Sequence, residues 1–293
     1  MILKDVQKNK FKTGIIVTLF FVFTCLLVYF ISLYFSKGNT YLAAIIGFAF
    51  AFISAFISYY NSDKMILSIN NARPANRDEF LQLNVSLESL CISAGLPMPK
   101  VYVMETNALN AFATGRNPEH AVVCVTTGLL NKLDKYELEG VLAHELSHIK
   151  NYDILVSTIA IVMVGFVSIL SDVFTRSLWY GSNRNNDSKA GSVLAIIGLI
   201  FIILSPIFAT LLKLAISRNR EYLADATGVE IARNKEGLIH ALEKLESDAE
   251  PMQVNKATES LFIINPLKNK EKDSLWSTHP STYNRIEKLK NIK

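Results

Sequence analysis

Charged residues are scarce in this chain and unevenly distributed. Only 19% of the 293 residues carry a charge, whereas 50% are hydrophobic, and the mean hydropathy is +0.26. Four stretches contain no charged residue: 13–36, 38–62, 154–171 and 190–212. Each has about 18 residues or more, the length of helix that crosses a hydrocarbon core of roughly 30 Å. The scarcity of charge predicts four transmembrane helices in two hairpins, with a buried core helix as the alternative for 154–171.

Cysteine is also rare, and its spacing excludes two kinds of site. The chain holds Cys25, Cys91 and Cys124, an odd number, and none of them forms a CxxC pair. This pattern supports neither a disulfide framework nor a thiolate zinc site, and it suits a reducing cytoplasm. The first apolar run lacks a small-x-small cleavage site and is followed at once by an equally apolar run. It therefore indicates a membrane anchor rather than a cleaved signal peptide.

Basic residues predict the orientation of the spans. Four lysines precede the first span: Lys4, Lys8, Lys10 and Lys12. Only Lys37 lies in the first hairpin loop, so the N-terminus is expected in the cytoplasm. The loop between the third and fourth spans gives no clear bias, and the even number of crossings places both termini and the soluble parts in the cytoplasm. Because the net charge of +4 lies largely near the two ends of the chain, no nucleic-acid partner is expected.

The charge distribution divides the chain into four parts. They are an N-terminal tail with the first hairpin (1–62), a first soluble part (63–153), a second hairpin (154–212) and a second soluble part (213–293). We expect the two soluble parts to assemble into one cytoplasmic α+β domain.

Hydrophobic periodicity predicts the elements of the soluble parts. Helices are expected within 73–97, 133–156, 212–234, 234–248 and 277–293, and strands within 100–106, 110–120 and 121–128. The predicted apolar stripes are Leu81, Val85 and Leu90, then Leu138, Val141, Leu142 and Leu146, and then Leu238, Leu242 and Leu245. Asp134 and Glu137 form a capping box, and no proline or glycine stop separates their helix from the third span, so the two are expected to be continuous or nearly so. Residues 249–278 are expected to be irregular and are a candidate lid.

The stretch AHELSHIK, residues 143–150, places two histidines one helical turn apart. Positions i and i+4 share a helix face, so His144 and His148 can both present an imidazole nitrogen to one Zn²⁺. Glu145 then points toward the water that the metal would activate, which is the HExxH arrangement of metalloproteases with glutamate as general base. The alternative is a pair of surface histidines with ordinary hydrogen bonds, and placement on a capped, periodic helix disfavours it.

A catalytic zinc ion needs a third protein ligand. No histidine follows within the next dozen residues, which argues against the extended motif HExxHxxGxxH. Glu221 and Asp225 form another i, i+4 pair, on the helix that leaves the fourth span at the same membrane face. We expect Glu221 as the third ligand and Asp225 as an acceptor that orients an imidazole. The alternative is that both carboxylates are simply solvated.

Several motifs occur together in one order along the chain. They are NAFATG at 110–115, LAHELSHIKNYD at 142–153, SRNREYLADATG at 217–228 and THPSTYNRI at 278–286, with the two hairpins around them. This combination resembles the HtpX family of integral-membrane zinc metallopeptidases, which are related to CAAX prenyl proteases. The resemblance implies a gluzincin site with one Zn²⁺ per subunit, in which Glu221 completes the HExxH ligands and Asp225 matches the aspartate of ExxxD. It also implies a bacterial cytoplasmic-membrane enzyme that degrades damaged or misfolded membrane proteins.

Three further features each allow two interpretations. His279 could donate a hydrogen bond to the oxyanion of the tetrahedral intermediate, if it approaches the zinc, or it is an exposed turn histidine. Arg285 either pairs with a carboxylate such as Asp225 or is solvated. The stretch that begins Asn110, Ala111, Phe112 has the composition of an edge strand. It either binds an extended peptide substrate through main-chain hydrogen bonds or is an ordinary sheet edge.

These expectations combine into an α-helical integral membrane protein with a cytoplasmic α+β zincin-like protease domain. The expected function is a zinc endopeptidase of membrane protein quality control, which acts on misfolded membrane proteins or unfolded proteins beside the lipid bilayer. One alternative is a narrow peptidase for lipidated C-termini, although four spans are too few for a large intramembrane chamber. Another is a non-catalytic, zinc-stabilised membrane scaffold, which would have no need of Glu145.

Overall fold

The computed structural model of the chain describes the first predicted soluble part, 63–153, completely, and describes the second predicted soluble part and the predicted hairpins in part. It describes residues 7, 9–11, 14–19, 21–22, 25, 40–161, 218–248, 250, 252, 254–255, 258–266 and 280–292. The fourth predicted span, most of the first and third spans, most of the 249–278 segment and His279 lie outside these residues. Judged by length and hydropathy, none of the helices in the described ranges meets the requirements of a membrane crossing.

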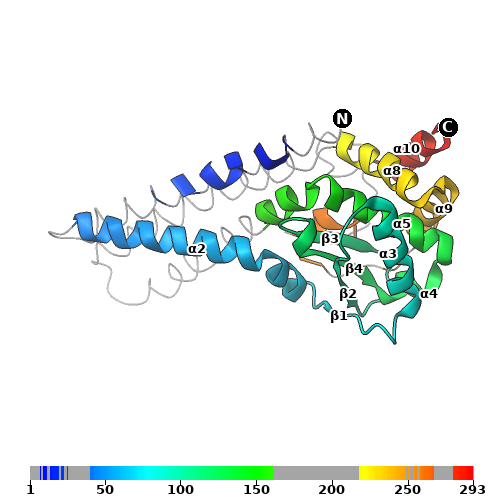
Figure 1. The fold of residues 1–293 in the computed structure, drawn as a ribbon, viewed down its shortest axis with the longest axis horizontal. Helices are drawn as coiled ribbons and strands as arrows, with labels where there is room; N and C mark the ends of the chain where they lie inside the picture. The colour runs from blue at the N-terminus through cyan, green and yellow to red at the C-terminus, as the bar shows by residue number, and fades with distance from the viewer. Residues whose placement is uncertain are drawn as a thin grey trace, which may run out of the picture.

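Helix α2 (Thr40–Ile69) covers the second predicted span and continues beyond it. In Figure 1 it projects away from the sheet and the other labelled helices. Large apolar side chains are more than half exposed along it: Leu42, Ile45, Phe48, Phe52, Ile53, Phe56 and Ile57. Its last turns are different, because Ile66 and Leu67 are buried against the sheet.

The centre of the fold is a mixed sheet of four strands in the order β1-β2-β4-β3. The strands are β1 (Arg73–Pro74), β2 (Lys100–Met104), β3 (Ala111–Gly115) and β4 (Ala121–Thr126). Strands β2 and β4 are parallel, and the other two pairings are antiparallel. The three longer strands lie within the predicted stretches, and β3 forms one edge of the sheet, as its composition indicates.

Both faces of the sheet are covered, and β4 shows how the sequence divides between them. Val123 and Val125 join the larger core, formed with the helices on one face, whereas Val122 and Cys124 face the end of α2 and the helical residues 153–161. Successive side chains of a strand point to opposite faces, so a run without polar residues is the pattern expected of a strand buried on both sides.

Helix α5 (Lys135–Lys150) lies at the centre of the larger core. It packs against α3 (Leu81–Ala94), α8 (Arg218–Ala232) and α9 (Lys235–Ser247). The described residues also form two shorter helices, α4 (Thr127–Lys132) and α10 (Thr282–Lys290), and two 3₁₀ turns, Pro118–His120 and Glu259–Leu261. The predicted capping box is present, and the predicted stripes of α5 and α9 are buried.

The predicted stripe of α3 is wrong at two of its three positions. Leu81 and Val85 are 58% and 50% exposed, whereas Leu83, Leu87 and Leu90 are buried. Nine residues separate Leu81 from Leu90, and at about 3.6 residues per turn they lie on opposite helix faces. The predicted helix also begins too early, because residues 73–74 form β1 and the helix starts at Leu81.

Helix α5 is not continuous with the helical residues that follow it. It ends at Lys150, with Asn151 as C-cap, and helical structure resumes at Asp153. Tyr152 between them has a φ of 58°, in the left-handed region. A two-residue break therefore turns the chain three residues after the second histidine of the HExxH motif, although neither glycine nor proline marks it.

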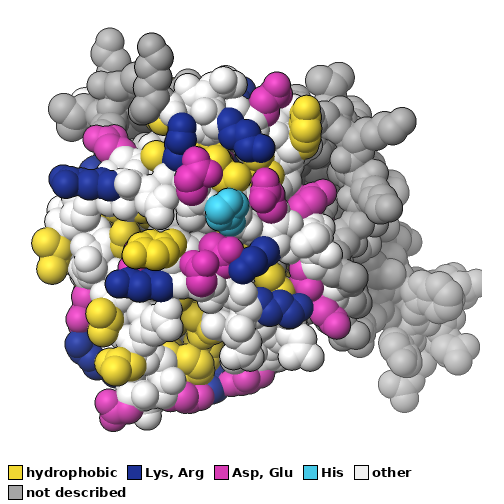
Figure 2. Space-filling model, turned by 90° about the vertical axis from the view of Figure 1, so that its right-hand side faces the viewer, with side chains coloured by type: hydrophobic (Ala, Val, Ile, Leu, Met, Phe, Trp, Pro, Cys, Tyr) yellow, Lys and Arg dark blue, Asp and Glu magenta, His cyan; other side chains and the backbone are white. Residues whose placement is uncertain are grey.

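Figure 2 shows the face at the end of the molecule that carries α8, α9 and α10 in Figure 1. Acidic and basic side chains are interspersed over this face, with small apolar areas between them.

Candidate metal centre

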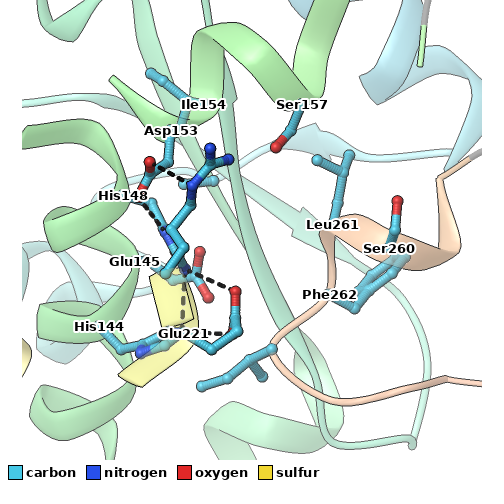
Figure 3. A pocket seen from close by; sticks show the side chains of 13 residues that line it. His144, Glu145, His148, Asp153, Ile154, Ser157, Glu221, Ser260, Leu261 and Phe262 are labelled. Carbon is cyan, nitrogen blue, oxygen red and sulfur yellow. Dashed lines mark hydrogen bonds and ion pairs between the residues drawn. The ribbon is translucent and has the colours of Figure 1, made fainter. Parts of the chain in front are cut away.

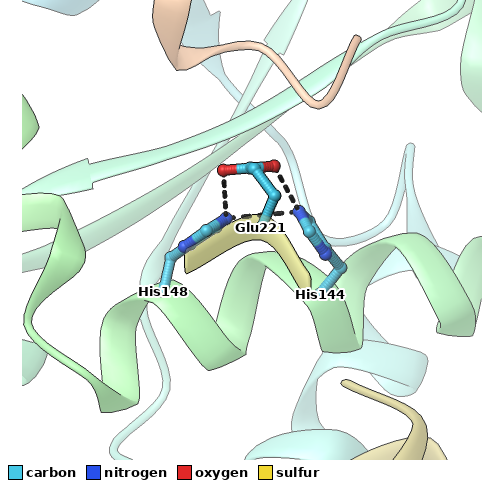
Figure 4. Close-up of side chains that lie close together, drawn as sticks. All are labelled: His144, His148 and Glu221. Atoms are coloured by element: carbon cyan, nitrogen blue, oxygen red, sulfur yellow. Dashed lines mark hydrogen bonds and ion pairs between the residues drawn. The ribbon is translucent and has the colours of Figure 1, made fainter. Parts of the chain in front are cut away.

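Helix α5 brings the two histidines of the HExxH motif together. His144 is fully buried and the side chain of His148 is only 15% exposed, and their Nε2 atoms lie 3.2 Å apart. The ring planes are inclined at 88° with centroids 4.7 Å apart. Figure 4 shows both rings rising from one helix face toward the same point.

Glu221 reaches this point from α8. Its Oε2 lies 3.7 Å from His144 Nε2, and its Oε1 lies 3.7 Å from His148 Nε2. The carboxylate sits above the two rings in Figure 4. One potential ligand atom from each of the three residues lies within 4.8 Å of the other two. The structure thus brings Glu221 together with the two histidines, and its coordination of a metal ion stays a prediction.

A glycine explains how α8 approaches α5 so closely. A Cβ atom on Gly228 would lie 3.0 Å from the backbone nitrogen and 3.1 Å from the Cα of His144. Glu221 precedes Gly228 by seven residues, about two helical turns, so both lie on the α8 face that contacts α5. The close crossing at Gly228 thus sets the depth at which Glu221 enters the site.

The donor set and its surroundings fit one metal ion. Two imidazoles and a carboxylate are a ligand set of catalytic zinc sites, which keep a further position open. Each histidine has its Nδ1 next to an aspartate, 2.9 Å from Asp225 for His144 and 3.1 Å from Asp153 for His148. With each Nδ1–H donated outward, both Nε2 lone pairs face the shared point, where a cation would resolve their mutual repulsion.

The charges around the histidines also favour a cation. Burial and the charge of Arg285 lower the pKa of His144, which keeps its imidazole neutral and able to ligate. Burial by itself would lower the pKa of His148, but the hydrogen bond to Asp153 and the charges of Glu221 and Glu145 raise it to about 9. The carboxylates thus stabilise a positive charge at this ring, whether it is a proton or a metal ion.

Glu145 is buried at the same site as the two histidines, and its pKa is raised. It is 1% exposed, it accepts a hydrogen bond from the Ala113 backbone N–H, and its Oε1 has no hydrogen-bond partner among the described residues. Burial, opposed by the charge of His148 and reinforced by that of Glu221, raises its pKa to about 7. A carboxylate with a pKa near neutrality can both accept and return a proton at physiological pH.

Asp225 and Arg285 form a buried ion pair behind His144. Arg285, only 1% exposed, donates from Nη2 to Oδ1 at 2.6 Å and from Nε to Oδ2 at 2.9 Å. Burial by itself would raise the pKa of Asp225, but the charge of Arg285 and the hydrogen bonds from His144 and Arg285 lower it below its ordinary value. Of the two interpretations of Arg285, the structure shows the pairing with Asp225.

The sequence-based reasoning did not identify Asp153 and Arg220 as parts of the site. Asp153 bridges His148 and Arg220, whose Nε lies 2.9 Å from Asp153 Oδ1. Both residues are buried. Asp153 stands inside the quoted motif LAHELSHIKNYD, and its position at the start of a long apolar run is the signal that could have drawn attention to it.

The predicted substrate-binding residues line the outer edge of β3, where the chain itself supplies contacts. Ala111 O accepts from Ile263 N at 3.0 Å, and the Asn110 side chain donates to Ile264 O at 3.2 Å. The ring of Phe112 packs edge-on against Phe262 with centroids 5.1 Å apart. Whether a substrate pairs with this edge stays a prediction.

A small cavity of about 30 Å³ adjoins the candidate metal centre. In Figure 3, His148, Glu145 and Glu221 lie on one side of it and Ser260, Leu261 and Phe262 on the other. Ser157 and Ile154 also line it, so the space beside the ligands has mixed apolar and hydroxyl walls.

Comparisons with known proteins agree with this geometry. The profile of peptidase family M48 matches residues 77–293, which include every residue of the candidate centre. A Protease HtpX homolog from Dictyoglomus thermophilum is 44% identical over 286 residues, 97% of this chain and 93% of that protein. One from Listeria monocytogenes serotype 4a is 43% identical over 308 aligned positions that cover both chains completely, and one from Thermoanaerobacter pseudethanolicus is 43% identical over 290 residues, 97% of this chain and 96% of that protein.

Among solved structures, Ste24p from S. mikatae shares the fold. Its TM-score is 0.50 at 18% identity, and the match covers 97% of this chain and 66% of that one. At this identity the likeness concerns the fold alone. The family match and the full-length relatives decide the classification: this chain belongs to peptidase family M48, among the HtpX protease homologues, and is a metallopeptidase.

Proposed function

We propose that this protein is a zinc-dependent endopeptidase of the bacterial cytoplasmic membrane that hydrolyses damaged or misfolded membrane proteins. The observation that carries the proposal is the meeting of His144, His148 and Glu221 beside the buried carboxylate of Glu145. These residues come from two helices and converge on one point (Figure 4), with a cavity next to it. Such a convergence of buried, titratable groups is what a hydrolytic centre requires.

We assign a role to each residue of the site from its contacts. His144, His148 and Glu221 would hold a zinc ion, which when bound acidifies water and polarises a carbonyl group. Glu145 takes a proton from the attacking water and passes it to the leaving amine. Asp225 and Asp153 hold the two rings with Nε2 directed inward, and Arg285 fixes Asp225. His279 is proposed to donate a hydrogen bond to the oxyanion.

The membrane location is supported by the chain outside the site. Four stretches free of charge flank the soluble parts, and the apolar side chains of α2 are exposed over much of its length. Contiguous exposed apolar surface of this kind is unfavourable in water and favourable in lipid. A protease that is anchored in lipid by such surface suits substrates that are themselves membrane proteins. The edge of β3 is proposed to pair with an extended substrate segment.

The decisive test is the substitution Glu145→Gln in the full-length protein in detergent. It keeps the shape of the side chain and removes its ability to accept a proton, so zinc binding should persist while cleavage of casein is lost. Glu119→Gln, at an exposed position, serves as the control and should cleave like the unchanged protein. Retained cleavage in Glu145→Gln would remove this mechanism. Casein is not prenylated, so its cleavage also distinguishes this function from a peptidase restricted to lipidated C-termini.

A further inference from the structure

The N-terminal segment, residues 7–11, reaches the candidate metal centre through one buried side chain. Asn9 is 5% exposed although its described neighbours Gln7, Lys10 and Phe11 are exposed. We propose that Asn9 is a positioning residue of the metal site, which ties the ends of the two ligand-bearing helices together. The inference rests on the proposed zinc site and adds a requirement to it, namely that the N-terminal segment must be in place.

The side chain of Asn9 contacts both helices at once. Its Nδ2 donates to Asp153 Oδ1 at 2.7 Å and to Asn151 O at 2.9 Å, directly after α5. Its Oδ1 accepts from Arg220 Nη2 at 3.0 Å, near the start of α8. A single amide thus bridges segments that lie 142 to 211 residues away in sequence.

Both bridged segments are adjacent to metal ligands. Asp153 accepts from Nδ1 of His148, and Arg220 immediately precedes Glu221 in α8. Partners that hold a ligating histidine in one orientation are part of what sets metal affinity. Asn9 does not touch a proposed ligand in any of these contacts and would act through Asp153 and Arg220.

The segment that Asn9 contacts includes a residue with an unfavourable backbone conformation. It is the two-residue break after α5, where Tyr152 adopts a left-handed backbone conformation that residues with side chains rarely occupy. Lys10, next to Asn9, places its Nζ 4.3 Å from the centre of the Tyr152 ring, at a distance typical of a cation–π contact. Two successive residues of the N-terminal segment, Asn9 and Lys10, therefore contact the turn that precedes Asp153.

The test compares two substitutions that separate hydrogen bonding from packing. Asn9→Ala removes the bridge, whereas Asn9→Asp keeps its size and the acceptor for Arg220 but puts a carboxylate oxygen against Asp153 Oδ1 and Asn151 O. The zinc dissociation constant is measured for the full-length protein in detergent by competition with a chelator, below the unfolding temperature of each variant. Gln7→Ala, at an exposed position of the same segment, is the matched control.

Asn9→Ala should raise the zinc dissociation constant about 10-fold, and Asn9→Asp by as much or more, toward about 100-fold, the range measured for partners of metal ligands. Gln7→Ala should bind zinc like the unchanged protein. At saturating zinc the Asn9 variants should regain casein cleavage with an unchanged KM, because Asn9 is not expected to touch substrate. If Asn9→Ala does not fold, Asn9→Asp decides alone.

Two results would overturn the inference: unchanged zinc affinity in the Asn9 variants, or an Asn9→Asp variant that binds zinc better than Asn9→Ala, as a role in packing alone predicts. Failure of the proposed function is a separate outcome. In that case the unchanged protein itself binds no zinc, or Glu145→Gln still cleaves casein, whatever the Asn9 variants do.

Discussion

Removing the charge of Arg285 tests how much its buried ion pair with Asp225 contributes to the stability of the protein. Arg285 is among the largest side chains that are fully buried, and it donates two hydrogen bonds to Asp225 and one, from Nη1 at 2.8 Å, to Ile263 O. Arg285→Met keeps a long apolar side chain and leaves Asp225 buried without its counter-charge. Breaking one side of a buried ion pair costs about 3–5 kcal/mol, so the free energy of unfolding should fall by that amount.

The assay is urea unfolding of the full-length protein in detergent, followed by circular dichroism at neutral pH. The double variant Asp225→Asn/Arg285→Met completes a cycle and should be less destabilised than the sum of the single variants, because no unpaired charge remains. A loss below about 1 kcal/mol in Arg285→Met, in the range of exposed ion pairs, would refute the reasoning. Strict additivity of the two substitutions would refute it as well.

The pH dependence of this pair has a definite sign. Burial by itself would raise the pKa of Asp225, but Arg285 holds it below the ordinary value. The contribution of the pair is therefore complete above the ordinary carboxyl pKa of about 3.9 and is lost as the pH falls through the lower folded-state value. In Arg285→Met, burial is no longer opposed by the arginine and raises the pKa of Asp225, so the stability difference between the unchanged protein and the variant should be small in acid and grow as the pH rises, until the pH exceeds that raised pKa.

Two further predictions concern packing and thiol chemistry. Gly228→Ala forces a Cβ against the His144 backbone, so it should lower the free energy of unfolding by about 1–3 kcal/mol and, by displacing Glu221, weaken zinc binding. The control Ala226→Ser, at an exposed position of the same helix, should change neither. Unaltered zinc affinity in Gly228→Ala would contradict the proposed role of the close crossing. Burial raises the pKa of Cys124 and raises that of Cys91 to about 11. Neither thiol of the folded protein should therefore react with iodoacetamide at pH 8, and both should react after unfolding. Labelling of either thiol in the native protein, measured by mass spectrometry, would contradict the packing around the sheet.

The sequence was sufficient wherever a feature depends on residues close together in the chain. His144 and His148 share a face because any α-helix places i and i+4 there, and Asp134 and Glu137 form their capping box within one turn. Strands β2 and β4 could be predicted because short apolar, β-branched runs between turn residues seldom form another kind of secondary structure. The buried stripes of α5 and α9 follow from the same local periodicity.

Local sequence patterns were not sufficient where two faces of a helix have similar hydrophobic spacing, or where no residue type marks the end of a helix. Leu81, Val85 and Leu90 satisfied a loose helical spacing, but only packing against α5 selects the face with Leu83 and Leu87. The break at Tyr152 carries no glycine or proline, and the residues that contact it, Lys10 and Asn9, lie far away in sequence.

By itself the sequence determined the chemical groups of this protein: a histidine pair with a neighbouring glutamate on one helix, a carboxylate pair on another, and the apolar runs around them. Only the tertiary structure decided their relations. It placed Glu221 at the histidines through a close crossing at Gly228, buried Arg285 against Asp225, and joined Asn9 to Asp153 and Arg220. The physical reason is that helix geometry fixes neighbours four residues apart, whereas contacts across more than a hundred residues depend on how whole elements pack.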